Sequence, residues 1–182
     1  MTQPPRPDAV SPGEPSGAPS AGDRDAWQAW AAALEETVLA LAVDASVTVA
    51  AAPSDARPVL LRRARLGGFL PARHDVVAPW VRLRRVEDHL RGTCVGAEAF
   101  GGPFPFGPQE DAALLALGWH RPGPGDGHDY VRFWPDDVPQ GAFLARDEAQ
   151  RAVAMVASTF REVLAREGAA PQIEGDPPNS SN

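Results

Sequence analysis

Two histidines and two aspartates gather in one turn-rich segment, residues 120–129, whose sequence is HRPGPGDGHD. Imidazole and carboxylate groups are ordinary ligands of zinc and other divalent metals. A set made of His120, His128 and Asp129 would therefore suit a small metal-dependent hydrolase. The spacing matches no established metal motif, and proline, glycine and aspartate are also the usual residues of a solvated turn. The segment predicts a loop, with the metal enzyme kept as an alternative.

The other nucleophiles and acids do not form a catalytic arrangement. The chain contains no lysine, which excludes chemistry based on a Schiff-base lysine or a Walker-type phosphate lysine. Cys94 is the single cysteine, and His89, five residues earlier on a predicted strand, would face the opposite side of the sheet. Adjacent acids such as Glu110 and Asp111 do not converge on one substrate atom. We therefore expect no catalytic residue, no bound metal and no cofactor.

Arginine is concentrated in the middle of the chain. Residues 57–91 hold nine arginines against three acidic residues, whereas the segments on either side are acidic. Arg82 and Arg84 alternate with apolar residues, so they share the polar face of a predicted strand that begins at Trp80. Together with Arg62 on an earlier predicted strand, they predict a basic sheet face that docks an acidic partner. The alternative is that the arginines neutralise acidic helices of the same domain.

The net charge bears on which macromolecule such a face would bind. The chain has 182 residues and a formal net charge of −7, whereas general nucleic-acid binders are usually basic. RNA-binding sheets also expose several aromatic rings for stacking, and Trp80 is the one aromatic residue of the arginine-rich strands. A protein partner is therefore the first prediction, and a regulatory nucleic-acid-binding domain is the weaker alternative.

The elements that must position these residues form one predicted domain over residues 25–167. Apolar stripes with helical spacing predict a first helix ending near Asp44 and a long helix over 147–166. Between them we predict strands at 46–52, 59–66, 80–86, 90–97 and 130–134, with a short helix after Pro108 and a loop over 67–78. A further short strand at 142–144 stays open. This order predicts an α+β fold, an antiparallel sheet flanked by helices.

The two ends of the sequence differ in composition from the predicted domain. Residues 1–24 contain six prolines and three glycines, and Ile173 is the one large apolar residue of residues 168–182. Such segments bury too little apolar surface to offset the entropy of ordering, so both are predicted to be disordered. The N-terminal segment has no apolar core of a secretory signal, and no apolar run is long enough to span a bilayer. We expect a cytoplasmic protein.

Several short pieces spread over the domain carry a family resemblance. The first pieces are the start of a strand at residues 79–82, then Gly96, then Gln109 followed by Leu114 and Leu117. The string Leu117, Gly118, Trp119 comes next, and Pro122 lies just beyond it. An aromatic strand and a long last helix complete the pattern. With these pieces the chain resembles the TY-Chap domains of actinobacterial proteins, which are related to type III secretion chaperones and YbjN-like proteins. The arginine-rich segment between 52 and 79 and the two tails depart from that pattern.

The resemblance implies a non-enzymatic protein-binding module without ATP or cofactor, dimerisation, and binding of an extended partner segment. Such a segment would dock on the sheet face or in a groove beside the long helix. Arg62, Arg82 and Arg84 would then contact acidic groups, and Trp80 would supply apolar area. The Leu-Gly-Trp string is predicted to be a structural latch.

The latch role of the Leu-Gly-Trp string follows from backbone chemistry. Gly118 can end the short helix in the left-handed conformation, Trp119 can fold back over the sheet and the first helix, and Pro122 prevents the helix from resuming.

Overall fold

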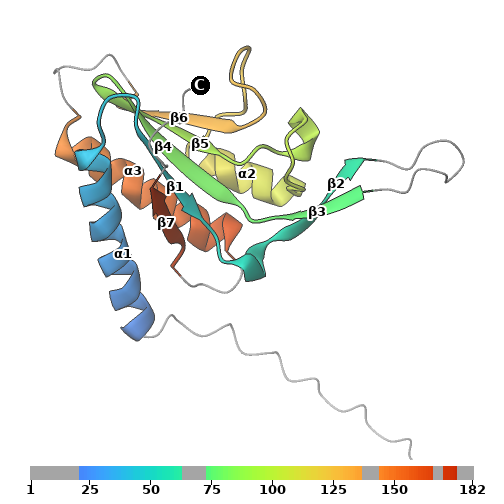
Figure 1. Ribbon diagram of the computed structural model, residues 1–182, viewed down its shortest axis with the longest axis horizontal. Helices are drawn as coiled ribbons and strands as arrows, with labels where there is room; N and C mark the ends of the chain where they lie inside the picture. The colour runs from blue at the N-terminus through green and yellow to red at the C-terminus, as the bar shows by residue number, and fades with distance from the viewer. Residues whose placement is uncertain (1–20, 63–72, 137–143, 166–169, 176–182) are drawn as a thin grey trace, which may run out of the picture.

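The computed structural model describes residues 21–62, 73–136, 144–165 and 170–175. Figure 1 shows the arrangement of its helices and strands. In chain order they are α1 (Ala21–Ala40), β1 (Ser46–Ala50), β2 (Arg57–Arg62), β3 (Arg73–Val77), β4 (Trp80–Val86), β5 (His89–Cys94), α2 (Pro108–Ala116), β6 (Tyr130–Trp134), α3 (Arg146–Thr159) and β7 (Gln172–Gly175). Short helical turns lie at Pro53–Asp55, Glu98–Phe100 and Phe160–Leu164.

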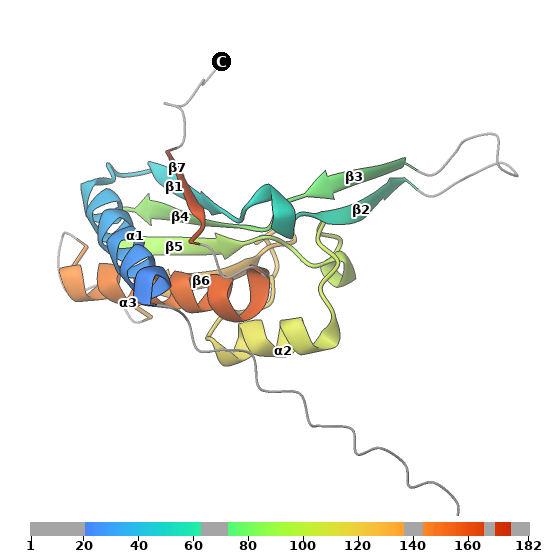
Figure 2. The ribbon, with the colours of Figure 1, turned by 90° about the horizontal axis from the view of Figure 1, so that it is seen from below.

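Five of the strands form one sheet, in the spatial order β6-β5-β4-β1-β7, and β2 pairs with β3 as a separate two-stranded arm. Every strand pair is antiparallel. Figure 2 shows α2 and α3 on one side of the five-stranded sheet, α1 beside α3, and the arm extending away from the helices. This arrangement confirms the predicted α+β fold. It also leaves the opposite face of the sheet without a helix over it among the described residues.

The core lies between the sheet and the helices, as the sequence periodicity predicts. Alternate residues of β1 and β4, such as Val47 and Leu83, are fully buried, because successive side chains of a strand point to opposite faces. The predicted apolar stripe of α1 is buried at Trp27, Trp30, Leu34 and Val38, and that of α3 at Ala149, Val153, Val156, Phe160, Val163 and Leu164. Both stripes are therefore confirmed.

Several boundaries differ from the prediction. Strands predicted at 46–52, 59–66 and 90–97 are found at Ser46–Ala50, Arg57–Arg62 and His89–Cys94. The first helix starts at Ala21 and ends at Ala40, so the turn before β1 already includes Asp44, whose φ is 68°. The regular α-helical part of the long helix ends at Thr159, and a wider π-turn continues to Leu164. The strands predicted at 80–86 and 90–97 pair with each other as β4 and β5, and Glu87 in the turn between them has a positive φ of 55°. Residues 142 and 143 lie outside the described residues.

The predicted loop over 67–78 is wrong for its second half, where β3 pairs with β2. The sequence RHDVV has too few alternating apolar residues to predict a strand by itself. Its backbone hydrogen bonds to β2 stabilise the extended form instead, and Val59 of β2 is buried at the base of the arm. Residues 67–72 lie outside the described residues.

The prediction that residues 168–182 are disordered is wrong for Gln172–Gly175, which form β7 and extend the sheet beyond β1. Ile173 lies opposite Val49 and packs against the core, while Gln172 and Glu174 are exposed. Ile173, the buried Pro171 just before the strand, and the backbone groups of β1 order this segment. Composition does not reveal such a partner, because it lies more than 120 residues away in the sequence.

Candidate functional site

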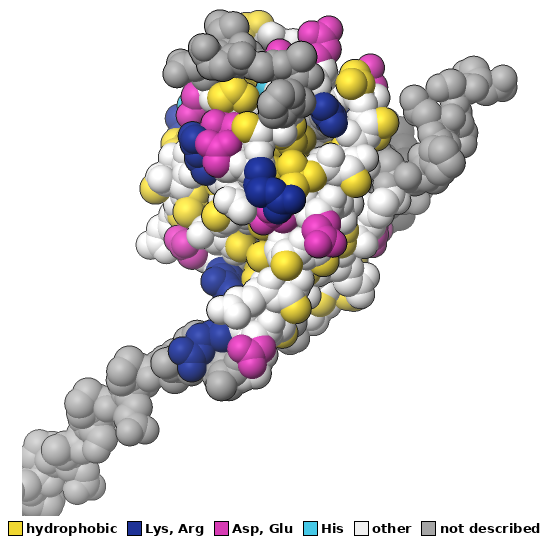
Figure 3. All heavy atoms as spheres, turned by 90° about the vertical axis from the view of Figure 1, so that its left-hand side faces the viewer, with side chains coloured by type: hydrophobic (Ala, Val, Ile, Leu, Met, Phe, Trp, Pro, Cys, Tyr) yellow, Lys and Arg dark blue, Asp and Glu magenta, His cyan; other side chains and the backbone are white. Residues whose placement is uncertain are grey.

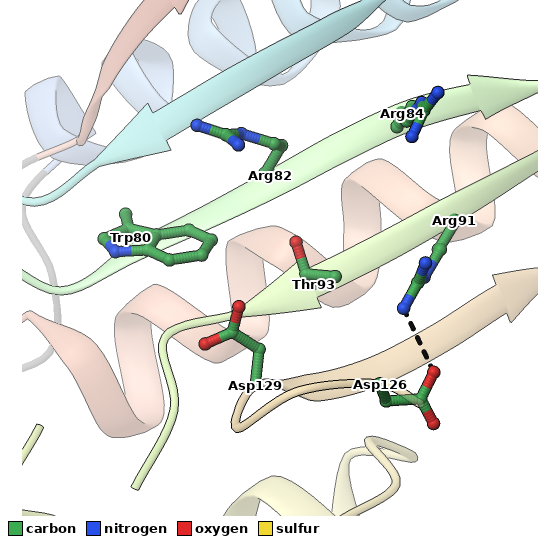
Figure 4. Close-up of a pocket in the computed structure, with 7 residues that line it drawn as sticks. All are labelled: Trp80, Arg82, Arg84, Arg91, Thr93, Asp126 and Asp129. Carbon is green, nitrogen blue, oxygen red and sulfur yellow. Dashed lines mark hydrogen bonds and ion pairs between the residues drawn. The ribbon is translucent and has the colours of Figure 1, made fainter. Parts of the chain in front are cut away.

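The uncovered face of the sheet carries a shallow pocket with a volume of about 210 Å³. It is lined by Trp80, Arg82 and Arg84 of β4, Arg91 and Thr93 of β5, and Asp126 and Asp129 of the loop before β6. Figure 4 shows these side chains on the outer side of the two strands and the loop. Three of the four predicted site residues therefore lie together, and sequence reasoning missed the contribution of β5.

Arg82 lies at the centre of this face and reaches across toward β1 (Figure 4). Its Nε donates a hydrogen bond of 3.1 Å to the hydroxyl of Thr48, and its guanidinium carbon lies 5.6 Å from the centre of the Trp80 ring. Among the described residues, no carboxylate forms an ion pair with it. Arg82 is therefore an exposed cation whose direct contacts are the hydroxyl of Thr48 and the ring of Trp80, and Asp129 of the same pocket interacts with it without forming an ion pair.

The other two arginines of the pocket are paired within the domain. Arg84 contacts Asp44 at 2.9 Å, and Arg91 contacts Asp126 at 3.0 Å. Both pairs lie within the domain, but they do not match the alternative as predicted, in which the arginines neutralise acidic helices. The acids are in turns and loops and not on helices.

Arg62, the fourth predicted site residue, does not lie with Trp80, Arg82 and Arg84. It lies at the end of β2, opposite Arg73 in the two-stranded arm, whereas Trp80 lies on β4 of the main sheet. The sequence could not reveal this division, because a strand pattern does not show which sheet the strand enters.

The side of the molecule that carries α1 differs from the pocket in how its charges are distributed. Figure 3 shows acidic and basic side chains interspersed on it, with apolar atoms between them. Charges there are balanced at short range, as at Arg146 with Glu35 and at Arg151 with Asp147.

The predicted metal ligands are held apart by separate partners. Nδ1 of His128 lies 2.6 Å from the backbone oxygen of Phe100, and Nε2 of His120 lies 3.2 Å from the guanidinium of Arg132. In the described parts of the chain, no three His, Cys, Asp or Glu side chains are grouped so that they could hold a metal ion. The metal-dependent alternative therefore gains no support from the geometry.

Asp129 contributes to the basic pocket instead. Burial raises the pKa of its carboxyl group, while a hydrogen bond from the backbone of Gly96 and the charges of His128, Arg82 and Arg91 act in the opposite direction. Gly96 itself must be a glycine here, because a Cβ atom would lie 2.2 Å from the backbone oxygen of His128. The glycine thus lets this loop approach the end of β5.

Cys94 is not a nucleophile. Its side chain is fully buried on the inner face of β5, and burial raises the pKa of the thiol far above its ordinary value. The thiolate form that nucleophilic attack requires is therefore disfavoured.

The predicted latch residues end α2 in the geometry of a Schellman motif. Gly118 has a φ of 101°, its N–H donates to the oxygen of Leu115, and the N–H of Trp119 donates to the oxygen of Leu114. The Trp119 indole is buried, lies edge-on to Trp134 of β6 and donates to the hydroxyl of Thr159 on α3. The ring thus lies against the sheet at β6, as predicted, and against α3 instead of the predicted first helix. Pro122 follows three residues later in the loop.

Asp111 of α2 should give the protein a measurable sensitivity to acid. Arg121 and then Tyr130 donate hydrogen bonds to its carboxylate, both at 2.6 Å, and lower its pKa below the ordinary value of 3.8. A carboxylate with a lowered pKa stabilises the fold above its unfolded pKa, and this contribution is lost as the pH falls through the folded value. Below about pH 4, wild type should therefore lose stability more steeply than Asp111→Asn in urea denaturation.

The control for this prediction is Asp147→Asn, because Asp147 is an exposed acid on α3. Equal acid sensitivity of wild type and Asp111→Asn would contradict the prediction.

The comparisons with known proteins identify the family. A family described as TY-Chap3, T3SS (YopN, CesT) and YbjN peptide-binding chaperone 3, matches residues 21–169. No curated protein and no solved structure matches the chain. Within the described residues, no helix is both long and apolar enough to cross a membrane. Because the match covers most of the chain, the resemblance is confirmed, and the protein belongs to the TY-Chap3 family of peptide-binding chaperones.

Proposed function

We propose that this protein is a non-enzymatic chaperone module that holds an extended, acidic segment of a client protein against the outer face of its sheet. The outer face is the surface formed by Trp80, Arg82 and Arg84 of β4 with Ser46, Thr48 and Ala50 of β1. The observation that carries the proposal is Arg82, an exposed guanidinium in the middle of this face with no carboxylate partner among the described residues.

Arg84 can bind the client together with Arg82, because breaking its ion pair with Asp44 costs little free energy. Its ion pair with Asp44 is exposed, with about half of the Arg84 side chain accessible to solvent, and exposed pairs contribute only about 0–1 kcal/mol. A client carboxylate can therefore replace Asp44. The half-buried ring of Trp80 adds apolar area beside the two cations.

The acidic residues of the pocket indicate on which side of β4 the client binds. Asp126 and Asp129 border the face on the side of β5 and β6, where they would repel an acidic segment. Arg82 points the other way, toward Thr48 of β1. The client is therefore expected on the β1 side of β4.

The test is a selection of random displayed peptides on the wild-type protein, followed by fluorescence anisotropy with the enriched peptide. We expect enrichment of Asp and Glu, and about ten- to a hundredfold weaker binding to the Arg82→Ser, Arg84→Ser variant, because two charge-assisted contacts are lost. The matched control is Arg146→Ser, Arg151→Ser, which removes two positive charges from exposed positions on α3. Equal losses in the two variants, or enrichment of basic peptides, would overturn the proposal.

Dimerisation is a further part of the proposal that follows from the family. Sedimentation equilibrium of the purified chain would measure it, and a monomer at all concentrations would contradict it without bearing on the outer face.

A further inference from the structure

The last strand of the sheet, β7, is a short strand at its edge. With four residues, β7 is the shortest of the strands that the structure describes, and it has a single neighbour, β1, at the edge of the sheet. Gln172, Glu174 and Gly175 are exposed, and only Ile173 is partly buried against the core. The family model matches residues 21–169. β7 therefore lies outside the part of the chain that the family model matches.

The side chains of β7 have the pattern expected of a bound client segment. Glu174 lies opposite Thr48, and Thr48 lies opposite Arg82 in the next strand, so these three residues form one row on the outer face. Ile173 lies opposite Val49 in the neighbouring row and faces the core. The chain thus places an acidic residue outward, in line with Arg82, and an apolar residue inward.

We propose that β7 occupies the place of the client, and that a client binds by pairing with β1 after β7 has left. The client would be an extended segment with an apolar residue at the position of Ile173 and an acidic residue at that of Glu174. This inference rests on the proposed function and adds to it the exact edge, the side-chain pattern and an internal competitor.

Main-chain pairing explains how one edge can accept both strands. The outer edge of β1 offers backbone N–H and C=O groups to any extended chain, and the alternate side chains of that chain determine its specificity. Because β7 is tethered to the same molecule, it competes at a high effective concentration. Client binding is therefore expected to be weak until β7 is displaced.

The first test locks β7 in place with a disulfide in the full-length chain. Opposite residues of antiparallel strands have Cα atoms about 4.5–5.5 Å apart, which suits a disulfide, so we choose Thr48→Cys with Glu174→Cys. The native Cys94 is fully buried and does not compete. We expect the oxidised protein to bind the selected acidic peptide at least about tenfold more weakly than the same protein after reduction. Equal binding in the two redox states would overturn the inference.

The second test releases β7 instead. Ile173→Asp removes the inward apolar contact of the strand, and Gln172→Asp makes the same charge change at an exposed position. The probe is a labelled synthetic peptide with the sequence of residues 170–176, APQIEGD. We expect it to bind the Ile173→Asp protein at least about tenfold more tightly than wild type or the Gln172→Asp control. Equal affinity for all three proteins would contradict the inference.

The two sets of variants separate this inference from the proposed function. If Arg82→Ser with Arg84→Ser weakens peptide binding while the disulfide lock has no effect, the outer face binds clients and the edge inference is wrong. If the lock abolishes binding and the arginine variant does not, the edge of β1 is the site and the role of the outer face is wrong.

Discussion

Trp119→Ala should lower the free energy of unfolding by about 3–5 kcal/mol, the usual cost of truncating a buried tryptophan. The ring is 1% exposed, it lies edge-on to Trp134 with 6.2 Å between the ring centres, and its Nε1 donates to Thr159 at 2.9 Å. Removing it leaves a cavity between α3 and β6, and it leaves the Thr159 hydroxyl without this donor. Urea denaturation monitored by circular dichroism would measure the loss.

Two further variants divide this effect into its parts. Trp119→Phe retains most of the apolar volume and loses the hydrogen bond, so it should cost about 1–3 kcal/mol. Leu115→Ala, at an exposed position of α2 in the same segment, should cost well under 1 kcal/mol. If Trp119→Ala were no more destabilising than Leu115→Ala, the latch would contribute nothing to the fold.

Local patterns were sufficient for the elements that build the core. The alternation of Val47 and Val49 and the stripe of α1 follow from strand and helix periodicity alone, and each was found buried. Gly118 likewise reveals its role locally, because a helix end in the left-handed conformation favours glycine. Such features depend on residues close together in the sequence.

Features that depend on pairing with another strand were not predictable. The arm strand β3 and the edge strand β7 have weak patterns of their own, and each is ordered by backbone pairing with another strand. The candidate site was predictable in part for the same reason. Trp80, Arg82 and Arg84 share one face by alternation, whereas the contributions of Arg91, Asp126 and Asp129 depend on how β5 packs with the loop before β6.

The arginine block of residues 57–91 shows how one sequence feature can contain two roles. Charge counting treats these arginines alike, but their exposure and partners differ. Arg82 is exposed with a neutral hydroxyl partner, whereas Arg57 at the start of the arm is mostly buried and paired with Glu110 of α2. The first is suited to an external partner, and the second joins two parts of the fold.

Arg57→Ala should accordingly lower the free energy of unfolding by about 3 kcal/mol, the lower end of the range for breaking a buried ion pair. Both terminal nitrogens of Arg57 donate to the Glu110 carboxylate, and the guanidinium lies 4.8 Å from the centre of the Phe104 ring. Its side chain is 11% exposed, so little water can replace these contacts. Thermal and urea denaturation would measure the loss.

A double-mutant cycle with Glu110→Ala isolates the ion pair from the loss of packing, and we expect a coupling energy above about 1 kcal/mol. The matched control is a cycle on Arg151 and Asp147, an exposed pair on α3, for which we expect about 0.3–0.5 kcal/mol. If the two coupling energies were equal, Arg57 would not anchor the arm to α2.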